Sequence, residues 1–348
     1  MDLLQPSYIS PTRFNDGGIE PLRLLQMEFP DYTSPPLPSA IDATPEAFRS
    51  DAAVDAARAN DADGLCFTLD DPTACQITFS PPPDTAVDSK VGVIFFGGFL
   101  VDPRSYSPMM RMLSDTYGLS VSVPIFAKDL AFKVGTCESG RLSLAQRAFP
   151  DIEKWVFAGH SLGGIAAANE VWAMAGRNET DAIGGLALLA SYVRQDLGCG
   201  LVDFSTEEWD WLHAASVSAS HDKIVNGANF EAGKKWLPSG NNTITVNIEG
   251  GNHRQFGCYD DSERESINYK VDGVPTVSAE DQQEQAASAI AEVASYARSP
   301  TNGVSSSGSM ASRFGQYMLD YFFLGRAGLW NPLLRSTNIK KMQQSALG

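Results

Sequence analysis

The sequence predicts an α/β fold in which helices flank a mostly parallel central sheet, with an extension at each end of the chain. Two observations lead to this prediction. Short apolar runs recur along the middle of the chain with helical segments between them, and one run leads directly into a Gly-x-Ser-x-Gly turn at Gly159, Ser161 and Gly163. Such runs suit strands buried on both faces, and their alternation with helices is typical of a parallel sheet. Ligands of these sheets bind at the carboxyl ends of the strands.

The N-terminal extension, residues 1 to about 60, is read as peripheral, with a proline-rich loop followed by a polar, alanine-rich helix over residues 44–60. Residues 66–79 alternate in polarity, which predicts two short antiparallel strands around an Asp-Asp-Pro turn. Cys66 and Cys75 could close a disulfide around this turn, but a reduced pair fits the pattern equally well. The pattern therefore leaves their redox state open.

The central domain spans residues 61–298 and contains the apolar runs that predict the core strands. These strands are expected at residues 91–96, 119–126, 155–158, 185–190, 214–219 and 243–248. The intervening segments with helical patterns are residues 106–117, 142–148 and the small-residue run 165–168, and a closing helix is expected at residues 279–297.

The C-terminal end differs in composition from the rest of the chain. Residues 299–312 form a Ser/Gly-rich linker, and residues 313–348 are aromatic, with five basic side chains and Asp320 as the one acid. The favoured interpretation is a helix docked on its own acidic domain. Peripheral contact with a lipid surface or a hydrophobic substrate, and contact with a partner protein, are the alternatives.

The overall charge restricts the partners. With 42 acidic and 26 basic residues the net charge is −16, which opposes binding to nucleic acid or to an anionic membrane. No apolar run reaches the roughly 20 residues of a membrane helix, and the N-terminus shows no signal peptide, so we expect a soluble protein whose compartment stays open. No pair of Cys and His residues has metal-ligand spacing, so no structural zinc is expected.

Ser161 is the candidate nucleophile. A serine hydroxyl is a poor nucleophile unless a base activates it, and a cramped turn between a strand and a helix displays it above the sheet. Glycines on both sides leave room for the strained backbone and for the helix to approach the strand. The pentapeptide alone also fits a turn without chemistry, but its flanking strand and helix favour the nucleophile.

The base and the acid follow from position. Among the four histidines, His160 lies inside the turn, His213 precedes a predicted core strand, and His221 is read as a loop residue. His253 follows the last predicted strand and is therefore expected at the same sheet edge as Ser161. Asp222 follows the strand at residues 214–219, so its carboxylate is expected to orient His253.

An oxyanion needs two hydrogen-bond donors. The backbone amide of Leu162, directly after Ser161 at a helix N-terminus, is expected to be one of them. The second is expected in the glycine-containing loop after the first core strand, where Phe99 is the preferred residue and Leu100 the fallback. Side chains proposed to line the substrate pocket include Leu100, Tyr106, His160 and Phe256.

Several stretches resemble the α/β-hydrolase superfamily, and within it a dienelactone-hydrolase-like branch. They include residues 129–132, 149–155, 186–192, 249–257, 272–273 and 278–282. The resemblance covers about residues 90 to 298, and it implies Ser161 as nucleophile, Asp222 as acid and His253 as base, in the chain order of that fold. Two departures stand out: Ser161 replaces the cysteine nucleophile of dienelactone hydrolases, and His221-Asp222-Lys223 replaces the common Asn-Asp-Gly acid turn.

Together these features predict a serine hydrolase that cleaves carboxylic esters, with a lipophilic small-molecule ester as the substrate. This chemistry needs no metal and no organic cofactor. A thioesterase or acyltransferase with the same triad is the alternative within the enzyme class. A non-catalytic binding protein on a hydrolase scaffold is the alternative outside it.

Overall fold

The computed structural model describes residues 39–40, 51–60, 66, 74–83, 90–126, 129–131, 140–195, 201–225, 227–260 and 271–298. The predicted linker and the aromatic, basic C-terminal segment lie outside these residues, as does most of the N-terminal extension. The domain boundaries at residues 60, 298 and 312 therefore stay predictions.

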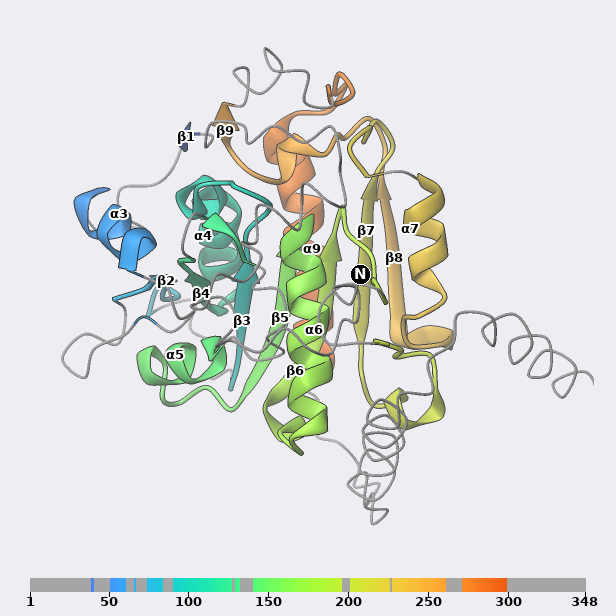
Figure 1. The fold of residues 1–348 in the computed structure, drawn as a ribbon, viewed down its shortest axis with the longest axis horizontal. Coiled ribbons are helices and arrows are strands. Elements are labelled where there is room, and N and C mark those ends of the chain that lie inside the picture. Colours follow the sequence, from blue (N-terminus) through green and yellow to red (C-terminus); the bar gives the residue numbers. More distant parts are fainter. Residues whose placement is uncertain are drawn as a thin grey trace, which may run out of the picture. The chain divides into compact units, whose positions relative to one another are not determined.

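A seven-stranded sheet forms the centre of the fold, in the order β2-β4-β3-β5-β6-β7-β8 (Figure 1). All neighbouring strands pair in parallel except β2, which runs antiparallel to β4. The bounds are β2 Gln76–Phe79, β3 Val91–Phe96, β4 Ser120–Pro124, β5 Lys154–His160, β6 Ile183–Leu189, β7 Ala214–Ala219 and β8 Thr243–Ile248. The six predicted core strands are thus confirmed, with ends that shift by a few residues.

The apolar runs reflect burial on both sheet faces. In β3, Val93 and Phe95 point into one hydrophobic core, and Ile94 and Phe96 point into the other. Because successive side chains of a strand point to opposite faces, a strand covered on both sides is apolar at most of its positions rather than at every second one. β8 differs, since it is the last strand of the described sheet and two of its six residues, Thr245 and Asn247, are exposed. The expectation of two-sided burial was wrong for this strand.

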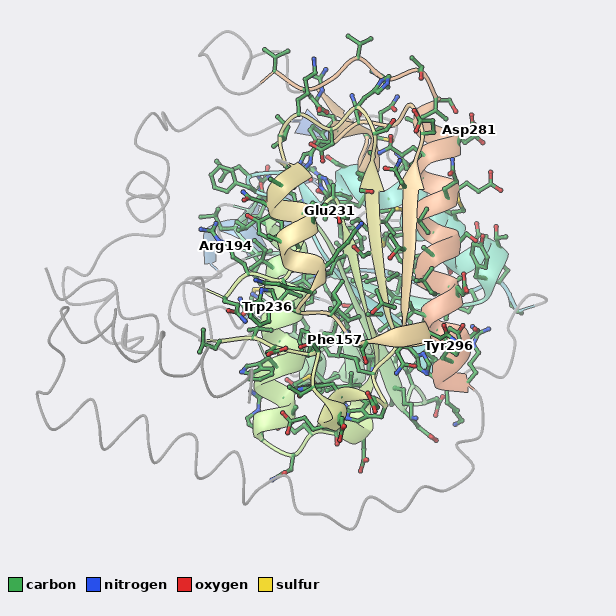
Figure 2. The ribbon with its side chains drawn as sticks, turned by 90° about the vertical axis from the view of Figure 1, so that its right-hand side faces the viewer. Phe157, Arg194, Glu231, Trp236, Asp281 and Tyr296 are labelled. Carbon is green, nitrogen blue, oxygen red and sulfur yellow. A yellow bond between two sulfur atoms is a disulfide. The ribbon has the colours of Figure 1, made fainter. Side chains whose placement is uncertain are left out.

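Helices cover both faces of the sheet. α4 (Ser107–Tyr117) and α9 (Ala279–Arg298) pack against one core, and α6 (Leu162–Gly176) packs against the other. Figure 1 shows α6 in front of the sheet and α9 behind it, and Figure 2 shows the two helices on opposite sides of the sheet, with α7 (Gly227–Lys234) on the α6 side. α5 spans Arg141–Ala148. Short 3₁₀ helices are Pro103–Tyr106, Thr180–Ala182, Glu207–Trp209, Gly240–Asn242 and Arg254–Phe256.

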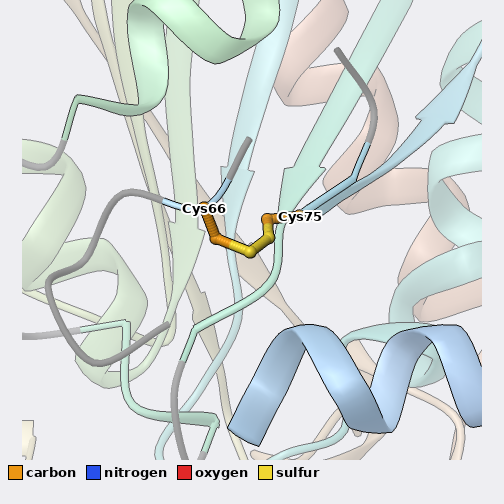
Figure 3. Close-up of a disulfide and its surroundings, with 2 residues drawn as sticks. All are labelled: Cys66 and Cys75. Atoms are coloured by element: carbon orange, nitrogen blue, oxygen red, sulfur yellow. A yellow bond between two sulfur atoms is a disulfide. The ribbon is translucent and has the colours of Figure 1, made fainter. Parts of the chain in front are cut away.

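Parts of the N-terminal extension contact the central domain. α3 spans Asp51–Asn60, within the predicted helix, whose residues 44–50 lie outside the described part; β1 (Ser39–Ala40) pairs antiparallel with β9 (Tyr259–Asp260). β2, the second strand of the predicted hairpin, pairs antiparallel with β4, and residues 67–73, which include the predicted turn, lie outside the described part. Cys66 and Cys75 form a disulfide with 5.1 Å between their Cα atoms (Figure 3).

None of the helices in the described part of the chain combines the length and the apolar composition that crossing a membrane requires.

Candidate active site

Ser161 lies in the tight turn between β5 and α6. Its backbone has φ 55° and ψ −122°, which a non-glycine residue rarely adopts. The Ser161 amide donates to the Leu189 carbonyl at 2.9 Å, and the Ser161 carbonyl accepts from the Ser191 hydroxyl at 2.6 Å. These contacts hold the strained turn in place while Ser161 stays partly exposed.

The glycines of the turn are required by backbone contacts. A Cβ atom on Gly159 would lie 2.3 Å from the Gly163 carbonyl oxygen, and one on Gly163 would lie 2.1 Å from the Phe96 carbonyl oxygen. Backbone atoms at these distances cannot move aside as a flexible side chain could. Glycine at both positions therefore lets α6 begin directly against β3 and β5.

Asp222 and His253 meet at the carboxyl edge of the sheet. Asp222 follows β7, His253 follows β8, and Asp222 Oδ2 lies 2.8 Å from His253 Nδ1. The other oxygen, Asp222 Oδ1, accepts from the amides of Ile224 at 2.8 Å and Val225 at 2.9 Å. Because Oδ1 is engaged by two amides, Oδ2 is directed at the imidazole. The arrangement places the proton on Nδ1 and leaves Nε2 as the acceptor.

His160 connects the serine turn to His253. It directly precedes Ser161, and its ring centroid lies 4.6 Å from that of His253. The imidazole of His253 therefore lies beside the turn that carries Ser161. Among the described contacts, no hydrogen bond joins the Ser161 hydroxyl to His253.

A buried hydrogen-bonded chain supports this arrangement, and the sequence did not reveal it. Tyr106 Oη lies 2.9 Å from His160 Nδ1 and accepts from the Gly98 amide at 2.8 Å. Burial lowers the pKa of His160 well below its usual value, and secondly so does the repulsion that a protonated His253 would exert. His160 is therefore neutral, which allows its Nδ1 to accept a hydrogen bond from the Tyr106 hydroxyl. The chain links the turn of Ser161 to the loop after β3.

The four side chains proposed to line the pocket are all buried: Leu100, Tyr106, His160 and Phe256. His160 contacts two of the others, since its ring centroid lies 5.8 Å from that of Tyr106 and 5.4 Å from that of Phe256. This packing explains their burial. Their contact with a substrate stays a prediction.

The two expected oxyanion donors lie on adjacent parts of the sheet edge. Leu162 is the first residue of α6, whose first amides have no partner within the helix and carry the positive end of its dipole. In the loop after β3, the Leu100 amide donates to the Asp129 carbonyl at 3.1 Å, so the fallback donor is engaged within the protein. Leu162 and Phe99 stay the predicted pair.

A charged cluster joins the N-terminal helix α3 to this loop. Arg58 forms ion pairs with Asp129 and, at 3.6 Å, with Asp102. Burial raises the pKa of Asp129 to about 7, although Arg58 acts in the opposite direction. Since the Asp129 carbonyl holds Leu100, α3 contacts the support of the candidate oxyanion loop. This contact of α3 was not predicted from the sequence, in which the extension has a polar composition typical of a peripheral segment.

In the part of the chain that the structure describes, no group of three or more His, Cys, Asp or Glu side chains is placed to hold a metal ion.

Comparison with known proteins identifies the scaffold. A family model described as the alpha/beta hydrolase family matches residues 92–284. Solved structures similar to the chain include carboxyl esterase 2 from the fungus Tuber melanosporum, at 14% identity and TM-score 0.40, covering 62% of this chain and 82% of the esterase. An esterase of Pyrobaculum calidifontis has 14% identity and TM-score 0.40, with 64% of this chain and 81% of the esterase covered.

A third similar structure is the RedJ thioesterase of the prodiginine biosynthetic pathway in Streptomyces coelicolor, at 13% identity and TM-score 0.36, covering 54% of this chain and 91% of the thioesterase. The comparison with curated proteins found no match.

Proposed function

Since the chain belongs to the alpha/beta hydrolase family, we propose that it is a serine hydrolase that cleaves carboxylic esters through an acyl-enzyme. The observation that carries this proposal is the 2.8 Å contact of Asp222 Oδ2 with His253 Nδ1, beside the strained turn that displays Ser161. A carboxylate on one imidazole nitrogen leaves the other nitrogen ready to accept a proton from a serine hydroxyl.

The proposed reaction has two halves. The Ser161 hydroxyl attacks the ester carbonyl while His253 Nε2 accepts its proton, and the amides of Leu162 and Phe99 stabilise the oxyanion. Collapse of the tetrahedral intermediate breaks the bond to the alcohol, which leaves with the proton from His253. Water then attacks the acyl-enzyme by the same route and releases the acid. Asp222 keeps its charge throughout and stabilises the imidazolium.

The α6 N-terminus supports the oxyanion assignment electrostatically. The helix dipole contributes about half a positive charge at its first turn, where Leu162 lies. A negative charge that develops beside this turn is stabilised without any rearrangement of the protein. Because Leu162 immediately follows Ser161, the donor and the nucleophile move as one unit.

A fluorophosphonate probe tests the proposal directly. We expect the probe to label the wild-type protein, and the labelled peptide to contain Ser161. Ser161→Ala should remove labelling, whereas the matched variant Ser218→Ala should retain it. Ser218 lies on β7 and not in the serine turn, and its hydroxyl donates to Asn247 Oδ1 at 3.0 Å. Folded wild-type protein that resists labelling would instead favour a binding protein on a hydrolase scaffold.

The leaving group and the acyl chain define the substrate class. We expect turnover of p-nitrophenyl esters, increasing with acyl chain length if the substrate is lipophilic. Thioesters with the same acyl groups provide the comparison. Faster acyl transfer from the thioester at equal acyl length would reassign the protein as a thioesterase with the same nucleophile.

A further inference from the structure

Asp272 is a buried carboxylate outside the proposed catalytic residues. Only 6% of the residue is exposed. Its Oδ2 accepts from the Arg254 amide at 2.9 Å, and its Oδ1 accepts from the Lys223 amide at 3.2 Å and from the Gly273 amide at 2.8 Å. Three backbone donors thus converge on one side chain.

Two of these donors lie next to the proposed catalytic residues. Lys223 follows Asp222 along the chain, and Arg254 follows His253. One Asp272 carboxylate therefore connects the turn that carries the acid to the loop that carries the base, which are 31 residues apart in sequence. The peptide groups that it holds are the ones that set the direction of the Asp222 and His253 side chains.

The segment around Asp272 is fitted between the same two loops. The Val274 carbonyl lies 2.7 Å from His221 Nδ1, and the Gly273 carbonyl accepts from Asn252 Nδ2 at 2.8 Å. A Cβ on Gly273 would lie 1.9 Å from the His221 carbonyl oxygen, so the backbone is in close contact with the acid turn. Gln282 of α9 bonds to both the amide and the carbonyl of Asn252, at 3.0 and 2.7 Å.

The chemistry of the contacts explains why a carboxylate stands here. All three partners are donors, and an ionised carboxylate only accepts, with room for several donors on its two oxygens. Hydrogen bonds from amides to a charged acceptor are stronger than neutral ones, which compensates for burying the charge. An Asn at position 272 would direct its NH₂ group, which is a donor, at a backbone N–H, which is also a donor.

We propose that Asp272 is a positioning residue that holds the Asp222 turn and the His253 loop in register for proton transfer. This inference rests on the proposed function, because it assigns Asp222 and His253 their roles. Asp272 acts through the amides of Lys223 and Arg254, and both of its oxygens are engaged by backbone donors. It is therefore distinct from the carboxylate that contacts the imidazole.

The test compares Asp272→Asn with Asp281→Asn. Both variants change a carboxylate to an amide in the same part of the chain, but the Asp281 side chain is exposed and accepts from the Ser278 hydroxyl at 2.6 Å. For Asp272→Asn we expect kcat for a p-nitrophenyl ester to fall by about 10- to 100-fold with little change in KM, because small misplacements of reacting groups have effects of this size. Asp281→Asn should keep the wild-type kcat.

A spectroscopic measurement separates positioning from general destabilisation. The proton between His253 Nδ1 and Asp222 should give a downfield ¹H NMR signal in the wild type, and Asp272→Asn should shift or broaden it at a temperature where the variant is folded. A wild-type kcat together with an unchanged signal in Asp272→Asn would overturn the inference.

If Asp272→Asn does not fold, hydrogen exchange in the wild type tests the contacts of Asp272 with the two loops. The amides of Lys223 and Arg254 should then exchange slowly, and exchange as fast as that of exposed amides would refute the proposed contacts. Failure of the proposed function is recognised separately, because the wild type itself would then resist the fluorophosphonate and hydrolyse no ester.

Discussion

Asp222→Asn is the sharpest test of the proposed triad, because the structure predicts how the new side chain must orient. Asp222 Oδ1 accepts from two backbone amides, whereas Oδ2 faces His253 Nδ1 at 2.8 Å. The single oxygen of Asn should stay with the two amides, since the opposite orientation would place NH₂ against both donors. The NH₂ group then faces Nδ1 and forces the imidazole to accept there.

The size of the effect follows from this change of tautomer. With Nδ1 as acceptor, the proton of His253 lies on Nε2, which can no longer accept the proton of Ser161. We expect kcat to fall by about 10⁴-fold, which corresponds to about 5 kcal/mol in the activation free energy. KM should change little, because only 7% of the Asp222 side chain is exposed and it is not expected to touch the substrate.

The assay is the initial rate of p-nitrophenyl butyrate hydrolysis, with thermal denaturation as the check on folding. Asp203→Asn is the matched control. The Asp203 carboxylate likewise accepts from a backbone amide and a hydroxyl, both of Ser205, and neither of these hydrogen bonds involves Asp222 or His253. A folded Asp222→Asn protein with kcat within about tenfold of the wild type would refute the assignment of the acid. An equal loss in Asp203→Asn would show that the effect is not specific to the triad.

Two further predictions concern stability. Gly163→Ala should lower the free energy of unfolding by about 1–3 kcal/mol or more, because its Cβ would lie 2.1 Å from the Phe96 carbonyl oxygen; the urea midpoint measures this, and an unchanged midpoint would contradict the contact. Burial raises the pKa of Asp129 from 3.8 to about 7, so the unfolded chain releases this proton at lower pH than the folded chain does. Protonation of Asp129 therefore favours the folded state fully below about pH 4. This contribution to the free energy of unfolding, up to about 4 kcal/mol, is lost as the pH rises to about 7. Urea denaturation between about pH 5 and 8 should show a shallower loss of stability in Asp129→Asn than in the wild type, and parallel pH profiles would contradict the assigned pKa.

Much of the fold could be predicted because its signals are local. Apolar runs predicted the six core strands, and the Gly-x-Ser-x-Gly pattern predicted the turn between β5 and α6. α7 was missed, since its eight residues include two glycines and its pattern is weak. The antiparallel pairing of β2 with β4 was also missed, because strand pairing depends on partners that are distant in sequence.

In the candidate site, too, locally marked residues could be predicted and contacts between distant residues could not. Chain order and the position after a strand were enough to select Ser161, Asp222 and His253 as candidates. The supports of the site were not predictable, since Arg58 and Asp129 are 71 residues apart and Tyr106 and His160 are 54 residues apart. No local pattern marks such pairs, because each side chain is ordinary in its own segment and becomes informative only through its partner.

The sequence by itself determined the class of fold and the residue types available for acyl transfer, because burial on both sheet faces and a strained serine turn each restrict which amino acids can occupy successive positions. Only the tertiary structure decided which hydrogen-bond donors each of two carboxylates at the sheet edge accepts from. Asp222 directs one oxygen at His253, whereas both oxygens of Asp272 are engaged by backbone amides. The reason is geometric: hydrogen bonds depend on distance and direction between atoms, and only the folded chain sets these for residues that lie far apart in sequence.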